Sequence, residues 1–150
     1  MPFHFTLAAV LRLHDSLEKA EMQRLQAAVA RVNEVRSQIE ILDAEMQRLR
    51  KQSRETATTS GVTGAELHFE IYRENAYRKS RADLVKLLAE CEKARQQQLL
   101  RYIEAHRQRE IFASIRDRQL TAYEIEQARR AQQRIDELFL LRRGNKTAQS

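Results

Sequence analysis

Helix-breaking residues are rare in this chain of 150 residues, which has three glycines, one proline and no tryptophan. Neither glycine nor proline occurs between Phe3 and Ser60 or between Ala65 and Arg143. Two uninterrupted stretches of this length, rich in Ala, Leu, Glu, Gln and Arg, are typical of long helices. We therefore expect most apolar burial to lie along a seam between helices, and no large compact core.

Cysteine and long apolar runs are also scarce. The single cysteine, Cys91, excludes an internal disulfide and a cysteine-rich metal site, and we interpret it as a small residue of a helix seam. No segment approaches the roughly 20 apolar residues of a membrane-spanning helix. The N-terminal stretch lacks the basic region and the cleavage site of a signal peptide. These absences predict a cytoplasmic protein.

Motifs for catalysis and metal binding are missing as well. No two of the four histidines stand four residues apart, as two metal ligands on one helix face would. Gly61 and Gly64 are not followed by the Lys-Ser/Thr pair of a phosphate-binding loop. Carboxylates on exposed helix faces are expected to pair with Arg and Lys. We predict that the protein is not an enzyme and holds no cofactor or metal.

Charge is abundant and uneven. Charged residues make up 32% of the chain, and the net charge of +6 arises mainly in residues 65–150, with 18 basic and 13 acidic residues. A basic surplus can indicate nucleic acid, an acidic membrane surface or an acidic protein. Because the signs alternate along the helices and no nucleic-acid-reading module is visible, we expect solvated helix faces and no nucleic-acid partner. Contact with a membrane surface through the C-terminal "LFLLRR" stays an alternative.

A heptad pattern predicts the first helix, over residues 6–53. Its apolar residues follow alternating steps of three and four, as in a coiled coil. The members of this seam are Leu25, Ala28, Val32, Val35, Ile39, Leu42, Met46 and Leu49. Upstream, the apolar residues Val10, Leu13, Leu17 and Ala20 are out of phase by one residue. We therefore expect a local irregularity at residues 22–24.

The second helix is predicted over residues 65–143. The Ser/Thr-rich residues 54–64 precede it as a loop, and Thr63 with Glu66 fits a capping box. Its seam is strongest from Tyr77 to Cys91, and the polar "RQQQ" of residues 95–98 is expected to interrupt it. Gly144 is placed to end the helix, and residues 144–150 are expected to be disordered.

These elements predict an all-α fold: one domain, residues 1–150, formed by an antiparallel two-helix coiled-coil hairpin. At 1.5 Å per residue the helices would be about 72 Å and 118 Å long. Paired from the loop outward, the second would overhang the first by its last ~30 residues, or some 45 Å. Whether this overhang folds back or dimerises stays open.

Three segments together resemble the FliJ family, the coiled-coil component of the bacterial flagellar type III export apparatus. They are "FTLAAVLRLHDSLEKAE" at the N-terminus, "ELHFEIYRENAYRKSRADLVKL" after the loop, and "RDRQLTAYEIEQARRAQQRIDELFLLRR" near the C-terminus, with the Asp136–Glu137 pair. The resemblance covers about residues 3–143. It implies a non-enzymatic antiparallel two-helix protein, similar to the stalk of rotary ATPases.

The resemblance also implies partners. These are the hexameric flagellar export ATPase and its regulator, the membrane export gate and some export chaperones, at the cytoplasmic face of the cell membrane, with membrane association through these partners. By this resemblance the open end of the hairpin would meet the ATPase ring through Leu7, Val10, Leu11, Ile135, Leu138, Phe139 and Leu141. Four apolar residues in a row, 138–141, point to all sides of a helix, and a ring with a central hole would cover them all.

For the export gate, the family's surface on the second helix corresponds to Arg73, Tyr77, Ser80 and Leu84. Their spacing places them on one helical stripe. Arg73 departs from the apolar residue expected there, and Tyr77 and Leu84 also fit the seam within the hairpin. The alternative functions are a generic coiled-coil adaptor or the analogous stalk of a virulence-type type III secretion system.

Overall fold

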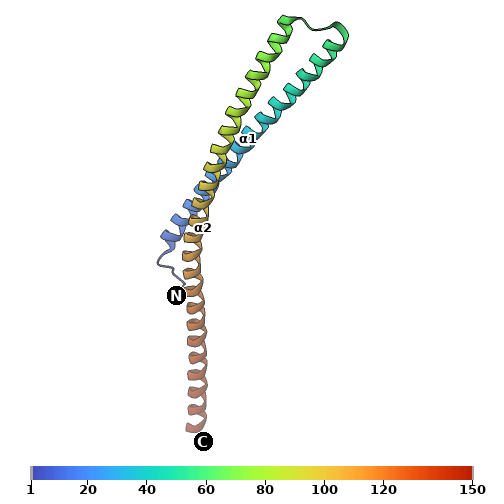
Figure 1. The fold of residues 1–150 in the computed structure, drawn as a ribbon. Coiled ribbons are helices and arrows are strands. Elements are labelled where there is room, and N and C mark those ends of the chain that lie inside the picture. The colour runs from blue at the N-terminus through green and yellow to red at the C-terminus, as the bar shows by residue number, and fades with distance from the viewer. Residues whose placement is uncertain (1, 150) are drawn as a thin grey trace. The chain divides into compact units, whose positions relative to one another are not determined.

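Two long helices make up the structure, a computed structural model that describes residues 2–149 (Figure 1). Helix α1 spans Ala8–Ser60 and helix α2 spans Gly64–Ala148. The two helices pack against each other, and residues 2–149 contain no β-strand. The predicted all-α helical hairpin is confirmed. Neither helix, over the described residues, is long and apolar enough to cross a membrane.

The loop between the helices is much shorter than the expected residues 54–64, because only residues 61–63 are non-helical. The Ser/Thr-rich stretch belongs to α1, and hydroxyls such as those of Thr56 and Thr59 donate hydrogen bonds to carbonyls one turn earlier, as mid-helix threonines commonly do. Gly61 then ends α1 with a positive φ of 72°, which glycine adopts without strain.

The start of α2 follows the prediction, and its end does not. The Thr63 amide donates to Glu66 Oε2 at 3.3 Å and the Glu66 amide donates to Thr63 Oγ1 at 3.2 Å, which is the predicted capping box. At the other end Gly144 does not stop the helix, and residues 144–148, expected in a disordered tail, are helical. Ser150 lies outside the described residues.

The hairpin divides into two compact units, each with a stretch of both helices. Unit 1 comprises Met1–Glu18 and Ala105–Ser150, and unit 2 comprises Lys19–Glu104, including the loop. In unit 2 the ion pairs show an antiparallel arrangement, because the partner's number falls as the α1 number rises. These pairs are Arg36–Glu92, Asp43–Arg81 and Arg50–Glu74.

The core of unit 2 is a thin apolar seam. Val32, Val35 and Met46 are at most 3% exposed, and all three belong to the predicted heptad series. The three residues lie on one stripe of α1, as expected for a chain without a globular core.

Aromatic contacts join the two helical stretches of unit 1. Ahead of α1, the Phe3 ring lies 5.5 Å from that of Tyr123, and Phe5 is 6% exposed. Within α1, the His14 ring stacks on Phe112 at 4.7 Å. These contacts place residues 3–14 antiparallel along residues 112–123 of α2.

The prediction that the heptad seam of α1 changes phase is wrong. The heptad series that ends at Leu49 continues backwards without a break through residues that are all at least partly buried, three of them polar. Its upstream members are Glu21, Glu18, His14, Leu11 and Leu7. Of the four residues expected in the upstream seam, Leu13 and Leu17 are 57% and 47% exposed, whereas Val10 and Ala20 are partly buried. The heptad phase is therefore constant along α1, and polar side chains occupy seam positions where apolar ones were expected.

The prediction that residues 95–98 interrupt the α2 seam is also wrong, because polar side chains occupy seam positions there. Partly or fully buried residues recur at steps of three and four through the polar segment. They are Leu84, Leu88, Cys91, Arg95, Gln98, Tyr102, Ala105, Arg109 and Phe112. Arg95 and Gln98 are thus seam residues, although they belong to "RQQQ", and Cys91 is half-buried as expected.

Candidate interaction surfaces

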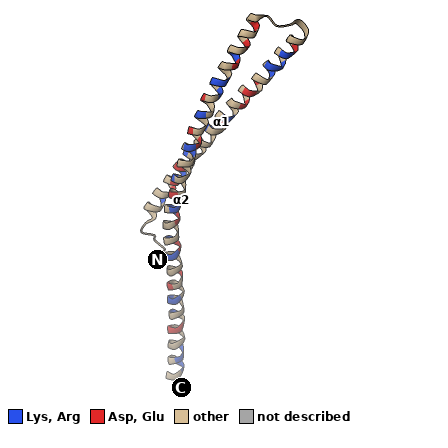
Figure 2. Ribbon diagram, viewed as in Figure 1, with Lys and Arg blue, Asp and Glu red and all other residues tan. Residues whose placement is uncertain are grey.

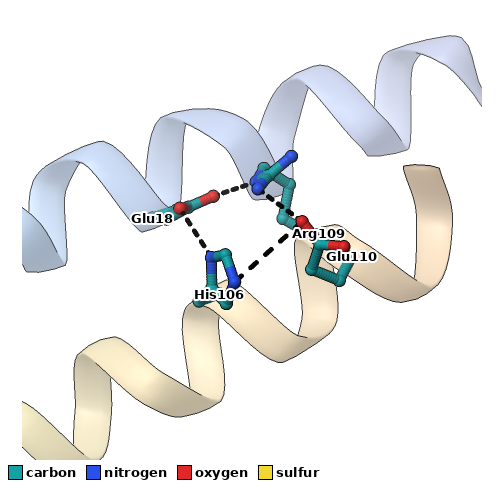
Figure 3. A network of polar contacts seen from close by, with 4 residues as sticks. All are labelled: Glu18, His106, Arg109 and Glu110. Atoms are coloured by element: carbon teal, nitrogen blue, oxygen red, sulfur yellow. Dashed lines mark hydrogen bonds and ion pairs between the residues drawn. The ribbon is translucent and has the colours of Figure 1, made fainter. Parts of the chain in front are cut away.

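The most connected polar group of unit 1 centres on Glu18 of α1, whose side chain is only 14% exposed (Figure 3). Glu18 accepts a hydrogen bond from His106 Nδ1 at 3.0 Å and another from Arg109 Nε of α2. Arg109 also donates to Glu110 Oε1 at 2.7 Å, and His106 Nε2 lies 3.9 Å from the same carboxylate. One carboxylate in the seam therefore connects α1 to two residues of α2.

The charge on Glu18 is stabilised by these donors. Burial raises the pKa of a carboxyl group, but the hydrogen bonds from His106 and Arg109 outweigh burial and hold the pKa of Glu18 below its ordinary value. The bond to Glu18 raises the pKa of Arg109 in turn. The group is therefore an ion-paired contact, and it has the features of a structural tie between helices.

A second polar contact lies in unit 2. The side-chain amide of Gln98 is 8% exposed and donates to the backbone oxygen of Glu21 at 3.2 Å and to the Glu21 carboxylate. The Nε atom of Arg95, one turn away, is buried without a hydrogen-bond partner. The paired Gln98 amide favours one register between the helices, because a shift would leave it buried without a partner.

The C-terminal surface, residues 128–149 of α2, has a different character. All its side chains are exposed, whereas residues up to Gln127 include partly buried ones. Ile135, Leu138, Phe139, Leu140 and Leu141 are between 59% and 66% exposed. Six Lys or Arg residues and two acidic residues lie in the same stretch (Figure 2). Exposed large apolar side chains in such a group are typical of a binding surface.

The structure does not bring the predicted ATPase-contact residues into one cluster. Leu7, Val10 and Leu11 are partly buried in unit 1, within the stretch that lies along residues 112–123. The α2 members of the set, Ile135 to Leu141, are exposed further along the helix. The exposed group alone is accessible to a partner without disturbing the packing of unit 1.

The predicted export-gate stripe lies in unit 2, and most of it borders one groove of about 250 Å³. Arg73, Tyr77 and Ser80 line it together with residues of α1 such as Leu42 and Met46. The Tyr77 hydroxyl donates to Asp43 at 2.5 Å, which holds the pKa of Asp43 below and that of Tyr77 above their ordinary values. Leu84 is partly buried in the seam and does not line this groove.

Sequence reasoning missed a cavity beside the loop, of about 480 Å³, lined by residues such as Leu49, Val62, Phe69 and Arg73. Arg73 donates to Ser53 Oγ at 3.1 Å, yet its Nε is buried without a partner. In Figure 1 α1 and α2 separate toward the loop. The available signal was the loss of large apolar residues from the α1 seam after Leu49.

The comparison with protein families decides which of the predicted identities applies. Residues 3–147 match the family described as Flagellar FliJ protein. The chain belongs to the FliJ family. No curated protein and no solved structure matches it.

Membership makes this FliJ-family chain a non-catalytic component of the flagellar protein export apparatus. Its described residues contain no group of three or more His, Cys, Asp or Glu that could hold a metal ion.

Proposed function

We propose that this chain is a stalk of the flagellar export apparatus, and that the C-terminal surface binds the ring of the export ATPase. The observation that carries the proposal is the run of four consecutive apolar side chains, Leu138–Leu141, each more than 60% exposed. Consecutive helical residues point about 100° apart, so the four together reach all sides of the helix. A ring that surrounds the helix covers all of them, which a single neighbouring helix does not.

The proposal includes a second contact, with the membrane export gate, at the groove beside Arg73, Tyr77 and Ser80. The support is that three of the four residues indicated by the family line one groove. Through the ATPase, its regulator and the gate, the chain would work at the cytoplasmic face of the membrane and assist the cycling of export chaperones.

Co-purification with the export ATPase and stimulation of its ATP hydrolysis test the first contact. Both Leu138→Ser and Leu140→Ser should weaken binding by roughly tenfold or more, because a surrounding ring desolvates both side chains. Leu67→Ser in unit 2, at 53% exposure, is the matched control and should bind like the wild type. Unchanged binding by both C-terminal variants would refute the proposed ring contact.

The gate contact has its own test. Ser80 is exposed, so Ser80→Arg fills the groove without removing a seam residue. We expect loss of co-purification with the gate protein and unchanged binding to the ATPase. Ser37→Arg, at an exposed position of α1, controls for the added charge. If the two variants bound the gate protein equally well, this groove would be excluded as the gate contact.

A further inference from the structure

One side of the helix in the C-terminal surface carries most of the large apolar side chains, three cations and no carboxylate. With 3.6 residues per turn, Ile135, Leu138, Phe139 and Leu141 occupy an arc of about 160°. Arg134, Arg142 and Lys146 fall within the same arc. Phe139, Arg142, Arg143 and Lys146 also line a single hollow on the helix surface.

The opposite side carries charges of both signs, with Arg129, Arg130 and Arg143 beside the two acidic residues. Both acidic residues of the stretch, Asp136 and Glu137, lie there with Leu140 between them around the helix. Asp136 accepts a hydrogen bond from Gln132 at 3.0 Å. The carboxylates are thus separated from the face that carries the largest apolar side chains.

We infer that this face of residues 128–149 binds the surface of an anionic membrane directly. A helix lying in the plane of the interface buries its apolar side chains below the headgroups. Its Arg and Lys side chains, with their long apolar stems, reach the lipid phosphates. The charge distribution favours this occupant, because the face carries three cations and no carboxylate, so its cations meet the phosphates while Asp136 and Glu137 face water.

This inference goes beyond the proposed stalk function, in which the membrane is reached only through other proteins. It also makes a different demand on Leu140. A ring that surrounds the helix covers Leu140, whereas a flat lipid surface leaves it in water. The two contacts use the same segment, so lipid and ATPase should compete for it.

The test uses the full chain alone with sedimented vesicles. One set is pure phosphatidylcholine, and the other is equal parts phosphatidylcholine and phosphatidylglycerol. We expect binding to the anionic vesicles only, weakened by added salt. Leu138→Ser should lower the partition coefficient by roughly tenfold, and Leu140→Ser by less than about twofold. These two leucines are 62% and 63% exposed, so the substitutions are matched.

Charge is tested by a second matched pair. Arg142 lies on the apolar face and Arg129 on the opposite side, where it pairs with Glu126 at 3.1 Å. Arg142→Gln should weaken vesicle binding by roughly fivefold, and Arg129→Gln should have little effect. Helical circular dichroism checks that the variants fold alike, and light scattering gives their mass.

The inference would be overturned if the chain did not bind vesicles or bound neutral vesicles equally well. Equal losses of binding for Leu138→Ser and Leu140→Ser would also overturn it. A change of mass in Leu138→Ser without vesicle binding would assign the face to a second copy of the chain. None of these touches the ATPase assay. A chain that binds the ATPase but not the vesicles retains the stalk function and loses only the membrane contact.

Discussion

In unit 2, α1 turns Val32, Val35 and Met46 toward α2, whereas in unit 1 the same heptad series places His14 and Glu18 there. The spacing is the same in both units, but the physical forces differ. Apolar seam residues contribute by leaving water, with little dependence on direction. An ion-paired carboxylate contributes only while its donors stay in place, because burial without them carries a penalty. Unit 2 should therefore contribute more stability through apolar burial, and the seam of unit 1 should depend on pH and salt through Glu18.

Removing a buried methyl pair from unit 2 should have the largest effect. Val35 is 0% exposed, and Val35→Ala should lower the free energy of unfolding by about 2 kcal/mol. Val29 is 38% exposed on the same helix, so Val29→Ala should cost less than about 0.5 kcal/mol. Both substitutions raise helix propensity by the same amount. The difference between the two variants in urea denaturation therefore measures the effect of burial. Similar midpoints would show that the unit 2 seam is not the stable part.

The ion-paired seam of unit 1 should respond to acid. The pKa of Glu18 is lowered in the folded chain, so its stabilisation is present above the unfolded pKa and disappears as the pH falls through the folded one. Glu18→Gln should cost about 1 kcal/mol at neutral pH and progressively less below the ordinary carboxyl value of 4.5.

Glu34→Gln is the control for that titration. Glu34 is 57% exposed and pairs with Arg31 on the same helix, so its substitution should leave both the stability and its pH dependence close to wild type. Denaturant melts over a series of pH values measure both variants. If Glu18→Gln lowered the free energy of unfolding equally at acid and neutral pH, the loss would come from packing and not from charge.

The apolar part of the seam could be predicted from the sequence because its periodicity and its chemistry agree. Leu25 to Leu49 repeat at heptad spacing with apolar residues throughout, and Thr63 with Glu66 form a local motif whose partners are three residues apart. Both signals depend on neighbours along one helix. The ATPase and gate residues come from the family resemblance, and their roles stay predictions.

The polar part could not be predicted by searching for apolar residues. Glu21, Glu18 and His14 stand at the heptad positions, but the pattern search selected the leucines one residue away. What decides the phase is the partner on α2, where His106 and Arg109 supply donors to Glu18. These partners lie about 90 residues further along the chain. The periodicity within one helix therefore does not reveal them. The cavity beside Phe69 was missed for a related reason, since it depends on the separation of two helices.

The smallest expected effect tests this reassignment of phase directly. Leu13 is 57% exposed, so Leu13→Ala should change the free energy of unfolding by less than about 0.5 kcal/mol, aided by the higher helix propensity of alanine. Leu11 lies in the seam, and Leu11→Ala should cost about 1 kcal/mol or more. If Leu13→Ala proved the more damaging of the two in urea denaturation, the seam of unit 1 would follow the leucines, and Glu18 would lie outside it.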